Sequence, residues 1–246
     1  MIPFISPNRK TTDSKTHFFL HIFSVPQRLP RLLMIKTPHL LLALSLLLPG
    51  GCASSPPSAK VVLWNDRDLV GWKMHLSDPK IDQATMWSAH DGVLHLVGKP
   101  NGYLRTDKTY SDYHLHVEWR WPVGAAARSN SGVFVDVSGP DGIWPQGVEC
   151  QLEAGNAGQL VGTKIDLPGA PVSNNKPRAP RLEASSEKPF GEWNSYEIYC
   201  RDDTIEVFVN GVRQNRVEKV SATSGAIGLQ MEGYPVDFRH IWLEPL

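Results

Sequence analysis

The sequence predicts an all-β fold, a single-domain β-sandwich or jelly roll that follows a leader and a short tether. Two observations support it. Short runs of alternating apolar and polar residues recur along the chain with turn signals between them, and no amphipathic helix longer than two turns is evident after the leader. Many short strands without helices are typical of two packed sheets. The 195 residues from Cys52 onward fit one domain.

The first 51 residues read as a leader that contains a secretory signal. From Met34 the chain has a short basic stretch, an apolar run from Leu40 to Leu48, small residues and then Cys52. The apolar run is about nine residues, well short of the ~20 that a bilayer span needs, which argues against a permanent membrane helix. Translation is expected to begin at Met34, because residues 1–33 do not fit the basic start of such a signal.

The small residues before Cys52 resemble a bacterial lipobox, in which the cysteine is lipidated and becomes the mature N-terminus. Pro49 departs from that pattern, and ordinary signal cleavage is the alternative. Residues 52–60 are small, polar and rich in proline, as in a flexible tether. We therefore expect an exported lipoprotein of the cell envelope, in the periplasm or at the outer membrane, that meets the membrane only through its lipid anchor.

Charge and cysteine content narrow the class of partner. Removing the six basic residues and the one acidic residue before Cys52 leaves 19 basic and 24 acidic residues, a net charge near −5. This balance gives no sign of a nucleic-acid partner. Cys150 and Cys200 are then the only other cysteines, and in an exported protein they could form a disulfide or remain two buried thiols.

Eight runs carry the strand pattern. They are residues 61–65, 92–98, 113–121, 131–137, 148–153, 194–200, 204–211 and 238–245. The dipeptides Asp91-Gly92 and Asn210-Gly211 are turn signals between such runs. Residues 155–188 differ, being rich in Pro, Asn, Ala and Ser and too long for a plain connection. A segment of this kind is expected to be a binding loop or disordered.

Two strands carry polar stripes. In residues 147–156 (GVECQLEAGN), alternation puts Glu149, Gln151 and Glu153 on one face. In residues 113–121 (YHLHVEWRW), the polar face carries His114, His116, Glu118 and Arg120. A solvated outer face would explain either stripe alone. If both lie on the concave face of one sheet, they form a groove for sugar.

Carboxylates in such a groove could act as acid and base or bind a metal ion. Glu149 and Glu153 lie about 13 Å apart on an ideal strand, beyond the range of either glycosidase mechanism. A partner carboxylate must then come from another strand, and Glu118 is the candidate. A nearby histidine such as His116 would favour a transition metal bound together with Glu149. Trp144, in a Gly/Pro-rich loop, could stack on a sugar ring or simply pack within its loop.

Five phrases resemble one protein family. They are LWNDRDLVGW (63–72), RSNSGVFV (128–135), VECQLE (148–153), GEWNSYEIYC (191–200) and the C-terminal GAIGLQMEGYPVDFRHIWLEPL. Their order and spacing hold from about residue 61 to 246. By these phrases the chain resembles domain of unknown function 1080, now described as the 3-keto-disaccharide hydrolase, or 3-keto-glucoside-1,2-lyase and 3-keto-2-hydroxy-glucal hydratase, domain.

The resemblance implies a concanavalin A-like jelly roll in an exported protein that acts on an oligosaccharide or glucoside. A sugar 3-dehydrogenase would first oxidise C3. The ketone acidifies the C2 hydrogen, a base removes it, the enolate expels the C1 substituent, and water adds to the 2-hydroxy-glucal. Such a site needs a base, an acid and a means of stabilising the enolate. A divalent metal ion is one way to supply the third.

Matching positions implied by the resemblance give the candidate site. Glu149 is the expected base or metal ligand, Glu118 the second carboxylate, and Gln151 and Arg120 the donors to substrate oxygens. The other matching polar positions are Asn130, Glu153, Gln230 and Arg239. An ion-pair network of Arg120, Glu118 and Arg239 across one sheet is the structural alternative.

Two positions depart from the family pattern. Glu232 stands where the family has a histidine, and His240 where it has an asparagine. If that histidine is the base or a metal ligand, this protein differs in metal or in activity. A lectin-like binding domain and a scaffold for partner enzymes are the competing hypotheses. For the enzyme, we predict that residues 147–156 line the substrate groove, with the segment that follows forming one wall.

Overall fold

The computed structural model describes residues 59–246, so the predicted leader, Cys52 and most of the tether lie outside the described residues. Apart from the 3-10 turn Gln83–Thr85, the regular elements are strands. They are β1 (Val61–Val62), β2 (Trp72–Leu76), β3 (Trp87–His90), β4 (Val93–Leu96), β5 (Gly102–Thr106), β6 (Tyr113–Arg120), β7 (Gly132–Ser138), β8 (Gln146–Gln151), β9 (Leu160–Thr163), β10 (Val172–Ser173), β11 (Lys176–Ala179), β12 (Asn194–Arg201), β13 (Thr204–Val209), β14 (Val212–Val217), β15 (Ala226–Met231) and β16 (Val236–Pro245). No helix within this range is long and apolar enough to cross a membrane.

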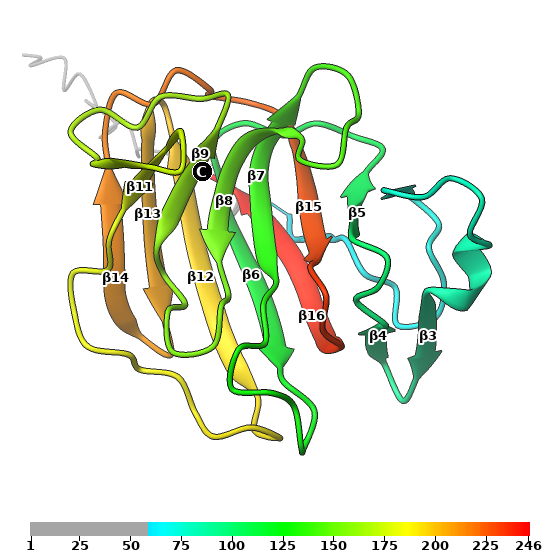
Figure 1. The fold of residues 1–246 in the computed structure, drawn as a ribbon. Helices are drawn as coiled ribbons and strands as arrows, with labels where there is room; N and C mark the ends of the chain where they lie inside the picture. Colours follow the sequence, from blue (N-terminus) through cyan, green and yellow to red (C-terminus); the bar gives the residue numbers. More distant parts are fainter. Residues whose placement is uncertain (1–58) are drawn as a thin grey trace, which may run out of the picture. The chain divides into compact units, whose positions relative to one another are not determined.

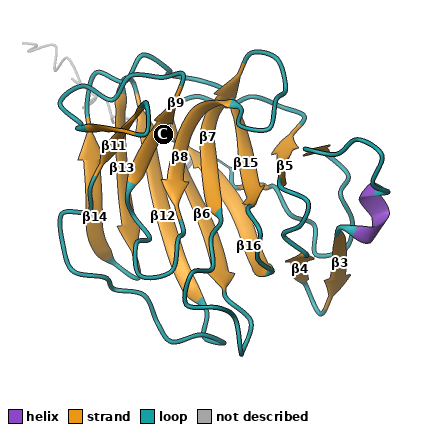
Figure 2. Ribbon diagram, viewed as in Figure 1, coloured by secondary structure: helices purple, strands orange, loops and turns teal. Residues whose placement is uncertain are grey.

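The strands form two antiparallel sheets (Figures 1 and 2). Sheet A has the order β14-β13-β12-β6-β16-β4-β3, with β1 also pairing with β16. Sheet B has the order β10-β11-β9-β8-β7-β15-β5-β2. The predicted all-β jelly-roll sandwich is thus confirmed.

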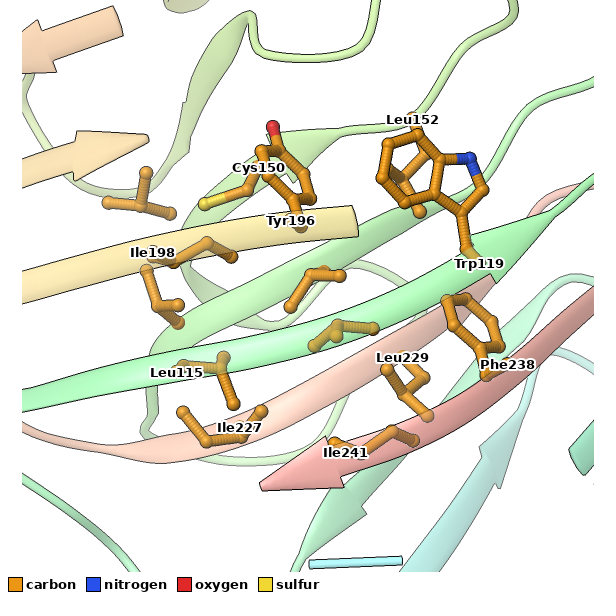
Figure 3. Close-up of a cluster of buried hydrophobic side chains, with 14 of the residues drawn as sticks. Leu115, Trp119, Cys150, Leu152, Tyr196, Ile198, Ile227, Leu229, Phe238 and Ile241 are labelled. Carbon is orange, nitrogen blue, oxygen red and sulfur yellow. The ribbon is translucent and has the colours of Figure 1, made fainter. Parts of the chain in front are cut away.

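The core lies between the sheets, where the apolar phase of each strand points inward. Figure 3 shows side chains of sheet A, such as Leu115 and Ile198, together with Cys150 and Leu229 of sheet B. All four side chains are fully buried. Cys150 and Cys200 are both buried free thiols in the structure, so of the two predicted alternatives it shows no disulfide.

All eight predicted runs contain a strand, and both turn signals connect hairpins. Asp91 and Gly92 have positive φ between β3 and β4, as do Asn210 and Gly211 between β13 and β14. A two-residue hairpin turn of this kind needs positive φ at both central residues, and Asn-Gly and Asp-Gly adopt this conformation with little strain.

The segment 155–188 is not the long loop that we expected. It contains β9, β10 and β11, which extend sheet B beyond β8. Asn174 and Asn175 both have positive φ and turn the chain between β10 and β11. Its Pro and Asn content therefore reflects short strands joined by tight turns.

Candidate functional site

A polar pocket opens on the outer face of sheet B. Along β8, Val148 and Cys150 belong to the core between the sheets, so Glu149 and Gln151 point to the opposite face. The same alternation on β15 buries Leu229 in the core and turns Gln230 outward. Two neighbouring strands therefore present polar side chains to one hollow.

The pocket has a volume of about 200 Å³. Pockets for drug-sized ligands are typically ~300–1,000 Å³, so this one suits a single sugar ring. Its lining residues come from β8, β11, β15 and the adjoining loops. They are Asn130, Trp144, Glu149, Gln151, Glu153, Lys176, Arg178, Gln230 and Glu232.

Gly132 on β7 gives the pocket its floor. A Cβ atom at this position would lie 2.9 Å from Cγ of Glu149 and 3.0 Å from Oε1 of both Glu149 and Gln230. Such contacts are too short, so any side chain here would displace both. The absence of a side chain at Gly132 lets these two oxygens sit over the backbone of β7.

Glu149 is the most perturbed group of the pocket. Only 5% of it is exposed, and its Oε1 has no hydrogen-bond partner among the described residues. Burial raises the pKa of Glu149 to about 7, and the nearby Glu232 carboxylate adds to the rise. The cations Lys176 and Arg178 and the Gln230 amide oppose it. A carboxyl with a pKa near neutrality can both accept and donate a proton, as an acid-base catalyst must.

Other polar atoms of the pocket are also buried without a partner among residues 59–246: Oδ1 of Asn130, Oε1 of Gln230 and Nε of Arg178. Buried polar atoms are normally paired, so a group of unpaired ones marks a place where a ligand completes the bonding. Asn130 donates from Nδ2 to Oε2 of Glu232 at 2.8 Å, which fixes that carboxylate at the rim. Burial raises the pKa of Glu232, and the neighbouring Glu153 contributes to the rise.

Gln151 is oriented by its own backbone. Its Oε1 accepts the N–H groups of Leu152 and Glu153, both at 2.9 Å. Because the carbonyl oxygen is engaged in this way, the NH₂ group remains to donate a hydrogen bond into the pocket. This geometry suits the predicted role of a donor to substrate oxygens.

Two cationic residues that we did not anticipate line the pocket. Lys176 and Arg178 lie on β11, in the segment that we expected to be a loop. Their spacing of two residues places both on one face of the strand. The ammonium of Lys176 lies 5.5 Å from the ring centroid of Trp144, which also packs against the Tyr103 and Phe134 cluster. The Asn174-Asn175 turn was the signal that could have revealed this hairpin.

The expectation that Glu118 and Arg120 share this site is wrong. Both lie on β6 in sheet A, where Leu115, Val117 and Trp119 fill the core and the alternate residues face outward. Stacked sheets lie about 10 Å apart, and the side chains in question point away from each other. Glu118 therefore cannot pair with Glu149 as a second carboxylate.

The same geometry excludes a metal ion shared by His116 and Glu149, because His116 also points outward from β6. Its Nδ1 lies 2.7 Å from Oε1 of Glu197, and its ring stacks on Trp242. Arg239, on β16, donates from Nε to Oε2 of Glu118 at 2.6 Å and likewise belongs to sheet A. These residues form a network of hydrogen bonds and an ion pair on the far side of the core.

The pocket offers oxygen ligands only. No group of three His, Cys, Asp or Glu side chains suited to a metal ion occurs within residues 59–246. Glu149 and Glu232 supply carboxylates, and Asn130 and Gln230 supply amide oxygens without a partner in this range. Such a set fits a hard cation such as Ca²⁺ or Mg²⁺ better than zinc, which prefers nitrogen and sulfur.

Solved structures resemble this fold. A Parabacteroides distasonis protein described as a candidate glycosyl hydrolase shares 21% identity at a TM-score of 0.56, over 76% of this chain and 100% of its own. The carbohydrate-binding module CBM66 of Bacillus subtilis shares 10% identity at a TM-score of 0.53, over 71% of this chain and 95% of its own. The β-glucanase of Bacillus licheniformis shares 14% identity at a TM-score of 0.52, over 78% of this chain and 100% of its own.

Fold and pocket together define a jelly-roll protein with a polar pocket on sheet B. A comparison with curated proteins gives no match. The family profile described as the 3-keto-alpha-glucoside-1,2-lyase-like domain matches residues 59–244, and the chain belongs to that family.

Proposed function

We propose that this protein cleaves 3-keto-glucosides by elimination and then hydrates the product. The observation that carries the proposal is Glu149, a buried carboxyl with a pKa of about 7 and an unpaired oxygen at the floor of a sugar-sized pocket. The family match supplies the substrate class. A binding module needs aromatic and amide groups, but it does not need a buried carboxyl with a raised pKa.

In the first step the ionised form of Glu149 takes the proton from C2 of the 3-keto sugar. The electron pair of the C2–H bond becomes the enolate, whose negative charge lies on the C3 oxygen. Lys176 and Arg178 are the cationic groups that can stabilise this charge, and Gln151 can donate to a neighbouring hydroxyl. The enolate then re-forms the ketone as the C1–O bond breaks and the aglycone leaves.

The leaving oxygen needs a proton, and two groups can supply it. Glu149 is protonated after the first step, and Glu232 has a raised pKa at the rim of the same pocket. The second reaction adds water across the C1=C2 bond, with the hydroxyl joining C1 and the proton returning to C2. A hard cation, if bound, would be held by the oxygens of Glu232, Asn130 and Gln230 and would act as a Lewis acid toward the sugar oxygens, while Glu149 stays free to act as the base.

Turnover of a chromogenic 3-keto-glucoside by the purified protein tests the proposal. Glu149→Gln keeps the size of the side chain but cannot accept a proton, and we expect a loss of at least about 100-fold, in line with general-base catalysis. Glu183→Gln, which replaces an exposed carboxylate outside the pocket, is the matched control. Saturable binding of the sugar without turnover by the wild type would instead establish the lectin-like alternative.

The biological setting that we propose is an exported lipoprotein anchored through Cys52, which acts after a sugar 3-dehydrogenase has oxidised the substrate. Support comes from the sequence of the leader and from the chemistry, since an elimination at C1 needs the C3 ketone. Cys52→Ala should release the protein from the membrane fraction of a bacterial host. Retention of the variant on the membrane would contradict lipid anchoring.

A further inference from the structure

A second hollow lies on the outer face of sheet A, on the opposite side of the core from Glu149. Its volume is about 580 Å³. The strands around it are β3, β4, β6 and β16, and Trp193 borders it just before β12. Arg120 and Arg239 also line it, which gives these two residues a setting other than the pocket where the sequence had placed them.

The two guanidinium groups are held in place by one indole and two carboxylates. The guanidinium carbons of Arg120 and Arg239 lie 4.5 and 4.1 Å from the ring centroid of Trp193. Nε of Arg120 donates to Oδ2 of Asp237 at 2.8 Å, and Nε of Arg239 donates to Oε2 of Glu118 at 2.6 Å. Stacking and an ion pair together restrain each guanidinium.

The pairing engages only Nε of each arginine, so the two terminal nitrogens of each guanidinium fork remain free. On sheet B, Arg105 engages Asp141 through both Nε and Nη2, at 2.7 and 2.9 Å, so its fork is occupied. Arg120 and Arg239 use Nε alone, and their terminal nitrogens form no hydrogen bond with residues 59–246. Their side chains remain 33% and 32% exposed. Solvent or a ligand must satisfy these four nitrogens.

The two carboxylates that pair with the guanidinium groups each have a second contact. Asp237 is buried, and it receives a second contact at 2.6 Å from Nδ1 of His95. The partner of Arg239, Glu118, also has His240 within 3.2 Å. Asp91 is a further carboxylate at this hollow, and it is exposed to water. The open ends of the two forks are therefore the rigid, charged donors that face the space.

We propose that this hollow binds an oxyanion carried by a glycan, the carboxylate of a uronic acid or a sulfate ester, at a site separate from the Glu149 pocket. Paired guanidinium forks match the geometry of such groups. A glycan is favoured as the carrier of the anion because the chain belongs to the 3-keto-alpha-glucoside-1,2-lyase-like family, a family of carbohydrate-active proteins. The site would hold an acidic chain irrespective of the elimination proposed at Glu149.

Calorimetric titration of the purified protein tests this site, with oligogalacturonate as the carboxylate probe, sulfated dextran as the sulfate probe and neutral dextran as the control. Arg120→Lys and Arg239→Lys keep each ion pair but lose the fork, and each should weaken acidic glycan binding at least 10-fold. Trp193→Phe keeps an aromatic ring with a smaller face and should weaken it less. Arg213→Lys, at an exposed edge of sheet A, is the matched control and should have no effect.

The stronger acidic probe identifies whether the carboxylate or the sulfate is the natural group. Loss of binding in both lysine variants, with unchanged melting temperatures and unchanged 3-keto-glucoside turnover, would support the site. Equal binding of neutral dextran would overturn it, as would wild-type affinity in both lysine variants. Binding to vesicles of anionic lipid without binding to either acidic glycan would also overturn it.

Discussion

Replacing Glu149 by glutamine should make the protein more stable at neutral and alkaline pH while removing its activity. The unfolded chain ionises this side chain near pH 4.5, whereas the folded protein does so near 7. The folded state therefore binds the proton more tightly. The contribution of Glu149 to folding stability is therefore fully present below pH 4.5 and is lost as the pH rises to about 7. The gap between the two pKa values corresponds to about 3 kcal/mol.

Urea unfolding at pH 5, 6.5 and 8 measures this difference. The wild type should lose more stability between pH 5 and 8 than Glu149→Gln does, by up to about 3 kcal/mol. Glu183→Gln, which alters an exposed carboxylate outside the pocket, should follow the wild type. Parallel pH profiles for the wild type and Glu149→Gln would refute the inference that Glu149 is held protonated near neutrality by burial.

Three further predictions follow from other positions. Asp136→Asn should stabilise the protein above pH 7 by up to about 4 kcal/mol in urea unfolding, because burial raises the pKa of Asp136 from 3.8 to about 7. Asparagine also tolerates the φ of 55° at this position. An unchanged unfolding midpoint at pH 8 would contradict this prediction. Gly132→Ala should reduce turnover at least 10-fold with intact folding by circular dichroism, because its Cβ would displace Glu149 and Gln230; full turnover would mean that the pocket floor is not needed. Calcium or magnesium should raise the melting temperature of the wild type but not of a Glu232→Gln variant, and equal shifts in both would place the cation elsewhere.

Local pattern was sufficient to predict eight of the sixteen strands within residues 59–246 and the facing of their side chains. Alternation in residues 148–153 correctly placed Glu149 and Gln151 on one face, because the side-chain period of a strand is fixed by its backbone. The two Asx-Gly turns were equally predictable, since both positions need a positive φ.

Which sheet a strand joins could not be predicted in this way. The partners of β6 are β12 and β16, far along the chain, whereas β8 pairs with its sequence neighbours β7 and β9. Both β6 and β8 have the same alternating pattern, so nothing local separates Glu118 from Glu149. Lys176 and Arg178 were not predicted as pocket residues because β11 is only four residues long and contains Pro177. Proline argues against a strand in a central position.

The most direct test of the proposed elimination is the deuterium isotope effect at C2. A 3-keto-glucoside deuterated at C2 would compete with the protium form in the presence of the wild-type protein, with product ratios measured by NMR. If Glu149 removes the C2 proton in the step that commits the substrate, the protium form should be consumed several times faster. Equal consumption of the two forms, with the C2 label retained in the product, would show that the glycosidic bond breaks without loss of the C2 hydrogen and would contradict the mechanism.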